Sequence, residues 1–337
     1  MRVAVIGGRG HFGRSVVAGL REHADIEVVV AGRSVHNDIR VDLADSASLH
    51  ALDEHDAVVN CADSLAAPPD MLVRRCLHGG PPLVETVGEP VAIRRILHSV
   101  ACDDTPPRSP VLLGAGIFPG MSNLVAAEAI AAVEDCSGVE VAMRWNPMSA
   151  GGAGMVGLVP HLLVVPTHRI VDGAVVEGPS MGPGPDLPFP DGVHGSLHLP
   201  FTEPTLLAHT HPHLRSIAAY GSVDPDVMMS MFRWFPKWLL CCRPMRALLW
   251  LQFTVIRRLV RRGTPAHVRI VARARNDAGK EEIRTFEAED GIATAGRIVA
   301  AMLLELRHAP PGLHVPGGSI LGGGIRDKWA SAAMASP

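Results

Sequence analysis

This chain of 337 residues has few aromatic side chains and no local cysteine motif. Phe, Trp and Tyr make up 4% of the sequence, and Tyr220 is the single tyrosine. The six cysteines form no C-x-x-C pair, which excludes a local zinc or redox motif and is typical of a reducing cytoplasm. Asp224 stands where a lysine would follow the tyrosine four residues later, so the Ser-Tyr-Lys site of one class of alcohol dehydrogenases is excluded as well.

The sequence also lacks an excess of charge. There are 31 basic and 34 acidic residues, for a formal net charge of −3, which argues against a general nucleic-acid binder. Hydrophobic residues make up 47% of the chain and the mean hydropathy is +0.20, as in a folded and rather apolar protein. This length can bury a large core in two domains. Because an apolar strand begins at Val3, we expect no cleavable signal peptide and a cytoplasmic protein.

Acidic residues are absent from Val227 through Asn276, and within this stretch residues 232–262 combine eight Lys or Arg with three of the five tryptophans. The longest uncharged run there, residues 247–256, is too short to span a membrane. Three interpretations stay open: a pair of core helices with basic outer faces, a helix lying in a membrane interface, and a docking surface for an acidic carrier protein. A fourth interpretation of the same segment is a lid over an apolar substrate.

A buried strand runs into a glycine-rich turn at the start of the chain. Residues 3–6 (VAVI) precede GGRGHFG at 7–13, and a helical pattern follows. Glycines let the backbone approach a phosphate, and the helix N-terminus supplies unpaired N–H groups and a positive dipole end. The G-x-G-x-x-G spacing starts at Gly8, but counting from the end of the strand favours a register that starts at Gly7. The predicted dinucleotide contacts in this turn are Gly7, Gly10, His11, Phe12 and Gly13.

The second strand, expected at residues 26–31, indicates which dinucleotide binds. NAD sites usually carry an acid about 20 residues past the glycines to bind the ribose 2′-OH. Here Arg33 and Ser34 follow the strand, and a guanidinium with a hydroxyl would hold a 2′-phosphate that an acid would repel. The sequence therefore favours NADP, with NAD as the alternative. Asp42, after a short third strand, either accepts from the adenine amino group or serves as a helix N-terminal acid.

Three further apolar strands, expected at residues 57–62, 82–86 and 111–114, alternate with helical stretches. Near-continuous apolar strands of this kind indicate a doubly wound parallel sheet covered on both faces. Ligands of such sheets bind at the carboxyl ends of the strands. The cofactor contacts expected there are Asn60, Cys61, Ala62, Thr86 and Gly116.

After residue 122 the pattern changes to an α+β domain with a mixed or antiparallel sheet. A helix is expected at 123–133, a strand at 139–145, and a hairpin that turns at residues 171–174. A loop at 178–195 is expected from its Gly and Pro content. Further strands are expected at 214–220, 268–274 and 283–288, the last two as a hairpin. The predicted domains are residues 1–122 (nucleotide binding), 123–288 (substrate and dimerisation) and 289–337 (a helix from Asp290 to Leu306, and a tail, returning to the first domain).

Reduction of a C=N or C=C bond needs a proton donor beside the hydride source. Tyr220 is a candidate, and Cys61 and Glu85 are candidates because they lie at expected strand ends; ordinary packing is the alternative for each. The run HTHPH at 209–213 offers His211 as an acid, and its alternate spacing on a strand also suggests a metal, although no acid completes a ligand set. We therefore predict no metal. The expected substrate contacts are Arg144, Ser149 and Gly152.

The sequence resembles the saccharopine dehydrogenase-like oxidoreductases. The resemblance rests on GGRGHFG at 7–13, AGRS at 31–34, VNCAD at 59–63, LVETVGE at 83–89 and GAGIFPGMSNLVA at 114–126. It is good over about residues 1–130 and poor between the loop at 149–154 and the hairpin from residue 266. The resemblance implies an N-terminal Rossmann domain, an inserted α+β domain, a C-terminal return to the first domain and a nicotinamide cofactor, often NADP. It does not imply saccharopine as the substrate.

These observations lead us to expect an NADP-dependent oxidoreductase that reduces a C=N or C=C bond of a small or lipophilic metabolite, in a homodimer. Two alternatives stay open. One is an amino-acid or opine-type dehydrogenase, for which Arg144 and Arg215 are the arginines available in the second domain. The other is a non-catalytic protein that binds NADP as a sensor or at a membrane.

Overall fold

The computed structural model describes residues 1–146, 165–227, 229, 251, 255 and 266–318. The chain divides into two compact units. Unit 1 consists of Met1–Leu124 and Ala293–Pro337, and unit 2 of Val125–Ile292. Almost all of the last long helix, from Ala293 on, belongs to unit 1.

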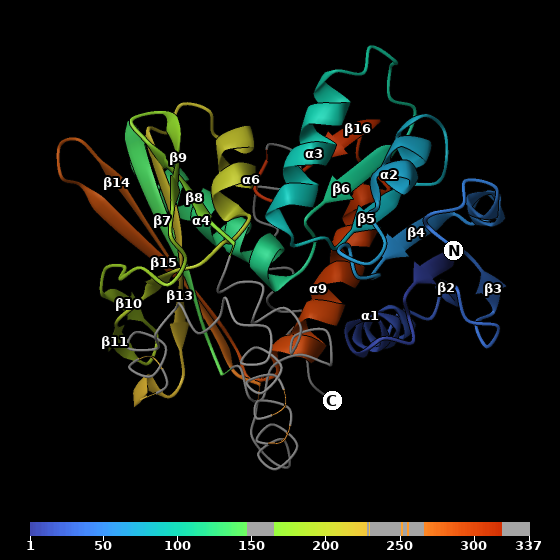
Figure 1. Ribbon diagram of the computed structural model, residues 1–337, viewed down its shortest axis with the longest axis horizontal. Helices are drawn as coiled ribbons and strands as arrows, with labels where there is room; N and C mark the ends of the chain where they lie inside the picture. Colours follow the sequence, from blue (N-terminus) through green and yellow to red (C-terminus); the bar gives the residue numbers. More distant parts are fainter. Residues whose placement is uncertain (147–164, 228, 230–250, 252–254, 256–265, 319–337) are drawn as a thin grey trace. The chain divides into compact units, whose positions relative to one another are not determined.

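Unit 1 contains a sheet of seven parallel strands (Figure 1). Four of them, β1, β4, β5 and β6, are almost entirely buried, as expected when both faces of a parallel sheet are covered. The predicted doubly wound parallel sheet is therefore confirmed. In spatial order the strands are β16 (Gly312–His314), β6 (Pro110–Leu113), β5 (Leu83–Glu85), β4 (Ala57–Asn60), β1 (Arg2–Ile6), β2 (Glu27–Gly32) and β3 (Ile39–Arg40).

Two glycines bring two helices of unit 1 into close contact, α1 (His11–Arg21) and α9 (Gly291–Leu306). A Cβ atom at Gly19 would lie 2.8 Å from the backbone of Gly296, so both helices need glycine at the crossing. Figure 1 shows them side by side. The other helices of this unit are α2 (Asp70–Leu77), α3 (Pro90–Ala101) and the short η1 (Ser48–Leu52) and η2 (Ile117–Met121); α4 (Ser122–Ala131) begins here and continues into unit 2.

Unit 2 is built on a mixed sheet whose central pair is parallel. Strand β7 pairs in parallel with β13, because the helix and hairpins between them carry the chain back to the same end, whereas the other pairings are antiparallel. The sheet is therefore mixed, which is one of the two forms expected from the sequence. The elements are β7 (Cys136–Trp145), β8 (Thr167–Val171), β9 (Ala174–Gly178), β12 (Leu197–His198), α6 (Glu203–Thr210), β13 (Ser216–Val223), β14 (Val268–Asn276) and β15 (Glu281–Ala288).

Both hairpin turns predicted in unit 2 are present. Asp172 and Gly173 have φ angles of 51° and 78°, so they form the tight turn between β8 and β9. The expected loop at 178–195 is partly wrong, since it contains a small hairpin of β10 (Leu187–Phe189) and β11 (Gly192–His194). Leu187 and Phe189 are buried against Tyr220 and Val271 of the sheet, and this packing orders a segment that its Gly and Pro content made look irregular.

Candidate functional site

The glycine turn of unit 1 is so tight that a side chain would obstruct it. Gly7 has φ of 75°, and its carbonyl oxygen accepts from the N–H of Gly10 at 2.8 Å. A Cβ atom at Gly13 would lie 2.1 Å from that same oxygen. The geometry therefore uses glycine at positions 7, 10 and 13, the register favoured by counting from the end of the strand.

The helix that follows this turn, α1, begins without a capping side chain or an acid that would offset its positive dipole end. Gly10 is its N-cap with extended backbone, so no side chain caps the helix, and its first turn contains no acid. His11 and Phe12 open this turn and are half-buried. An uncapped helix N-terminus presents backbone N–H groups and a positive dipole end, which together bind phosphate well.

The end of β2 turns sharply and exposes Arg33 and Ser34. Gly32 has φ of 153°, and a Cβ atom there would lie 2.8 Å from Nδ2 of Asn37. Ser34 accepts the backbone N–H of His36 at 3.3 Å. The carboxylate of Asp38 accepts the N–H of Val30 at 2.8 Å. The carboxylate of Asp38 is thus hydrogen-bonded to β2, while Arg33 and Ser34 lie at the surface.

One contact at this loop was missed by the sequence analysis. The Nη2 atom of Arg9, in the glycine turn, donates to the carbonyl oxygen of His36. The glycine turn is also tied to the end of β2 by the Gly7 N–H, which donates to Ala31 O at 3.0 Å. No signal in the sequence pairs Arg9 with residue 36, because the two are 27 residues apart and meet only where β1 and β2 end side by side.

Asp42 stabilises a turn. Its Oδ1 accepts the N–H of Ala44 at 3.1 Å, and its backbone oxygen accepts the hydroxyl of Ser48 at 2.8 Å. These bonds order the segment before η1. Of the two roles considered for Asp42, this geometry favours the structural one, in which the acid precedes a helix.

The ends of β4 and β5 are joined by a buried polar pair. Nδ2 of Asn60 donates to Oε2 of Glu85 at 2.8 Å, and Oδ1 of Asn60 accepts the N–H of Ala62 at 3.1 Å. The hydroxyl of Thr86 donates to the Asn60 carbonyl at 2.8 Å. A Cβ atom at Gly7 would lie 3.0 Å from the carbonyl group of Cys61, so this pair borders the glycine turn. The structure thus brings together the residues predicted at this edge.

Burial changes the protonation of this edge. It raises the pKa of Glu85 to about 8, against the opposing effect of the Asn60 hydrogen bond, so the side chain carries a proton at neutral pH. Burial and the neighbouring Glu85 also raise the pKa of the Cys61 thiol. Cys61 is therefore a thiol rather than a nucleophilic thiolate.

The turn after β6 is fixed to the same edge. The N–H groups of Gly114 and Ala115 donate to Glu85 O at 2.9 and 3.0 Å, and Gly116 has φ of 155°. At the start of α4, Oδ1 of Asn123 accepts the N–H of Gly120 at 3.1 Å. This bond orients the amide, and Nδ2 of Asn123 is buried without a hydrogen-bond partner. Buried donors are normally paired, so Nδ2 is available to a further acceptor.

The tyrosine and the histidine cluster of unit 2 lie in ordinary packing. The hydroxyl of Tyr220 is 3.5 Å from Oε1 of Glu140, and burial followed by Glu140 raises the pKa of Tyr220 to about 12. The HTHPH run does not lie on a strand, because α6 ends at Thr210 and a turn follows it, so its histidines do not share one strand face as a metal site would need. Nδ1 of His211 forms a hydrogen bond of 2.8 Å with the Thr210 hydroxyl. Burial lowers the pKa of His211.

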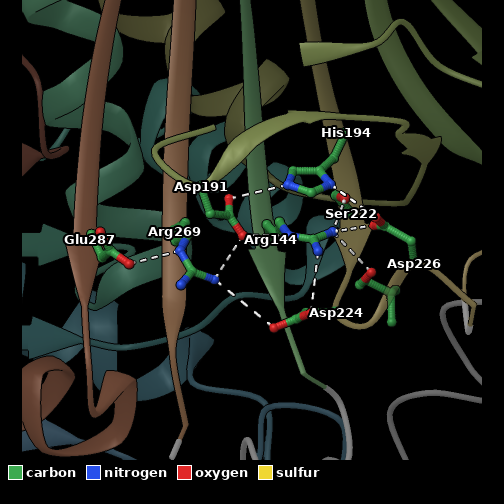
Figure 2. A network of polar contacts seen from close by, with 9 residues as sticks. Arg144, Asp191, His194, Ser222, Asp224, Asp226, Arg269 and Glu287 are labelled. Atoms are coloured by element: carbon green, nitrogen blue, oxygen red, sulfur yellow. Dashed lines mark hydrogen bonds and ion pairs between the residues drawn. The ribbon is translucent and has the colours of Figure 1, made fainter. Parts of the chain in front are cut away.

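Arg144, the predicted substrate contact, lies at the centre of an ion-pair network (Figure 2). It is 3% exposed, and each nitrogen of its guanidinium donates to the protein. Arg269, on the neighbouring strand β14, lies 3.1 Å from the carboxylate of Asp191. The acceptors of Arg144 are Asp191, Ser222, Val223, Asp224 and Asp226, at 2.8 to 3.2 Å.

Arg215, the second arginine considered for an amino-acid dehydrogenase, is also paired with an acid. Arg215 donates to Asp277 at the surface. Ser149, Gly152 and almost all of residues 232–262 lie outside the described residues.

Among the residues described, no group of three or more His, Cys, Asp or Glu side chains is arranged to hold a metal ion. Within the same residues, no helix combines the length and the apolar character needed to cross a bilayer.

Comparison with known proteins identifies the fold. No family model and no curated sequence matches this chain. Among solved structures, apo saccharopine dehydrogenase (L-Glu forming) from Saccharomyces cerevisiae is similar with a TM-score of 0.62 at 15% identity, over 99% of this chain and 96% of that one. DAP dehydrogenase of C. glutamicum, in complex with DAP, is similar with a TM-score of 0.50 at 12% identity, over 98% of both chains. The chain therefore has a saccharopine dehydrogenase-like fold, with a Rossmann-like parallel sheet and a second unit built on a mixed sheet.

Proposed function

We propose that this protein is an NADP-dependent oxidoreductase that reduces a C=N or C=C bond of a small or lipophilic metabolite by hydride transfer. The observation that carries the proposal is the turn at Gly7–Gly13, which leads into a helix with no cap and no acid in its first turn. Both similar structures are named dehydrogenases, which supports this class of reaction without indicating a substrate.

The residues of unit 1 fit a nicotinamide dinucleotide. The three glycines leave a cradle that a Cβ at residue 13 would fill, and the N–H groups at the start of α1 face it. Arg33 and Ser34 are exposed where β2 ends, as a 2′-phosphate site requires. The unpaired Nδ2 of Asn123 suits the carboxamide oxygen of a nicotinamide. A bound cofactor would supply the hydride.

The pair of Asn60 and Glu85 serves as a support in this proposal. Both carboxyl oxygens of Glu85 accept N–H groups of the protein, from Asn60 and from Val87. Glu85 thereby holds the amide of Asn60, which in turn holds the N–H of Ala62. A positioning role at the nicotinamide end follows from these bonds. None of the four predicted proton donors has a geometry that assigns it that role.

The reaction class is tested with the purified full-length chain. NADPH and NADH are titrated by nicotinamide fluorescence, and NADPH oxidation is then followed with a panel of cyclic imines, 2-oxo acids with amines, and α,β-unsaturated thioesters. We expect tighter binding of NADPH and turnover of at least one class. Turnover of 2-oxo acids with amines would favour the amino-acid dehydrogenase alternative. Binding without any turnover would favour the sensor alternative, and binding of neither cofactor would overturn the proposal.

A further inference from the structure

Arg9 reaches from the glycine turn to the loop that follows β2. Its Nη2 atom donates to the carbonyl of His36, between Arg33 and Asp38 in the chain. The two loops are also joined by the Gly7–Ala31 backbone bond of 3.0 Å. Because parallel strands β1 and β2 end side by side, the guanidinium of Arg9 lies over the loop that carries Arg33 and Ser34.

The charges at this place favour an anion. Arg9 and Arg33 are exposed, and within the described part of the chain neither forms an ion pair with a carboxylate. Arg40, also exposed, is the register partner of Gly32 on β3. The two acids of the same segment accept backbone N–H groups instead, Asp38 from Val30 and Asp42 from Ala44. The guanidinium groups of Arg9, Arg33 and Arg40 are therefore not paired directly with any carboxylate of the described residues.

We infer that Arg9 is a specificity residue for a phosphomonoester: with Arg33 and Ser34 it binds the 2′-phosphate of the nucleotide. This inference rests on the proposed function and adds a residue from a different loop. The bond to His36 uses one N–H of Arg9, and the other N–H groups of the planar fork are left to bind phosphate oxygens. Arg9 thus reads the phosphate from the side of the glycine turn, and Arg33 from the side of β2.

A purely structural Arg9 would act differently, because it would only hold the two loops together. Losing such a tether would weaken NADPH and NADH alike. Losing a phosphate ligand weakens only the nucleotides that carry the 2′-phosphate. The matched pair of 2′,5′-ADP and 5′-AMP isolates this group without the nicotinamide end.

The experiment compares Arg9→Gln and Arg9→Lys with the wild type, and uses Arg21→Gln as control because Arg21 is an exposed arginine at the far end of α1. Dissociation constants are measured by calorimetry for NADPH, NADH, 2′,5′-ADP and 5′-AMP. For Arg9→Gln we expect about 10- to 100-fold weaker NADPH and 2′,5′-ADP, with NADH and 5′-AMP changed less than about threefold. Arg9→Lys keeps the positive charge but loses the planar fork of N–H donors. Its dissociation constants for NADPH and 2′,5′-ADP should therefore lie between those of the wild type and those of Arg9→Gln.

Each other outcome is informative. A wild type that binds NADPH tighter than NADH, with Arg9→Gln indistinguishable from Arg21→Gln, overturns the inference and leaves the proposed function standing. Equal losses for all four nucleotides assign Arg9 a structural role and also overturn it. A wild type that binds none of the nucleotides overturns the proposed function and the inference together.

Discussion

Two polar clusters in the described part of this protein use similar residue types in opposite ways. In unit 2, Arg144 is buried and donates to protein oxygens with every nitrogen of its guanidinium. In unit 1, Arg9 and Arg33 are exposed without a carboxylate partner in the described part of the chain, and Asn123 has a buried amide without an acceptor. An arginine whose nitrogens all donate within the protein stabilises the fold, whereas donors without a partner are suited to bind a ligand. Substitutions in the two clusters should therefore have different effects, on nucleotide binding in unit 1 and on stability in unit 2.

The largest effect is expected at the glycine turn. Gly13→Ala places a methyl group 2.1 Å from Gly7 O, so the turn must open and lose its cradle. We expect NADPH affinity to fall by more than about a thousandfold. The measurement is a fluorescence titration, with circular dichroism to verify folding. Gly178→Ala is the control, because its Cβ meets nothing closer than 3.5 Å. An affinity within tenfold of wild type would contradict the cradle.

Glu85 should make folding depend on pH. Burial raises its pKa to about 8, so the folded protein holds this proton more tightly than the unfolded chain does. The resulting stabilisation is complete below the ordinary glutamate pKa and is lost as the pH rises through about 8. Glu85→Gln mimics the neutral acid and does not titrate.

Relative to the wild type, the variant should therefore gain stability between about pH 5 and about pH 9, by up to a few kcal/mol. Urea unfolding at several pH values measures this difference. Glu54→Gln, at an exposed position, is the control. Parallel pH curves for wild type and Glu85→Gln would show that Glu85 is ionised at neutral pH.

Reversing a charge at the end of β2 should change the preference for the cofactor. Arg33→Asp places a carboxylate beside the 2′-phosphate, and we expect about 100-fold weaker NADPH and a much smaller change for NADH. The same titrations as for the wild type measure both constants. Equal losses for the two cofactors would remove Arg33 from the phosphate site.

Removing the centre of the satisfied cluster should affect stability and leave the nucleotide site alone. Arg144→Met leaves Asp191, Asp224 and Asp226 without their shared cation, and we expect a loss of about 2 kcal/mol or more in the free energy of unfolding. NADPH affinity should change less than about twofold. Thermal unfolding and titration measure the two quantities. Unchanged stability with lost turnover would instead return Arg144 to the role of a substrate contact.

The smallest effect is expected at Asn123. Asn123→Asp keeps an oxygen for the Gly120 N–H and removes the unpaired Nδ2 donor. We expect about tenfold weaker NADPH and unchanged binding of 2′-phospho-ADP-ribose, which lacks the nicotinamide. Asn276→Asp is the control, because Asn276, the last residue of β14, also accepts a backbone N–H and donates to a carbonyl. An equal loss for both ligands would place Asn123 outside the nicotinamide end.

The sequence by itself determined the features that depend on local pattern. Apolar runs predicted the strands of the parallel sheet, because a strand buried on both faces needs apolar residues at successive positions. Glycine spacing predicted the turn at residues 7–13, and VDGA at 171–174 predicted a hairpin, because both rest on backbone conformations that few residues adopt.

Tertiary structure decided whatever depends on residues distant in the chain. It made β7 and β13 parallel, ordered β10 and β11 against Tyr220, and ended α6 within the run of histidines. It placed Arg9 against residue 36 and surrounded Arg144 with acids from two loops. A sequence shows that an arginine is present, but its partners are chosen by packing, and those partners decide whether its charge stabilises the fold or is left for a ligand.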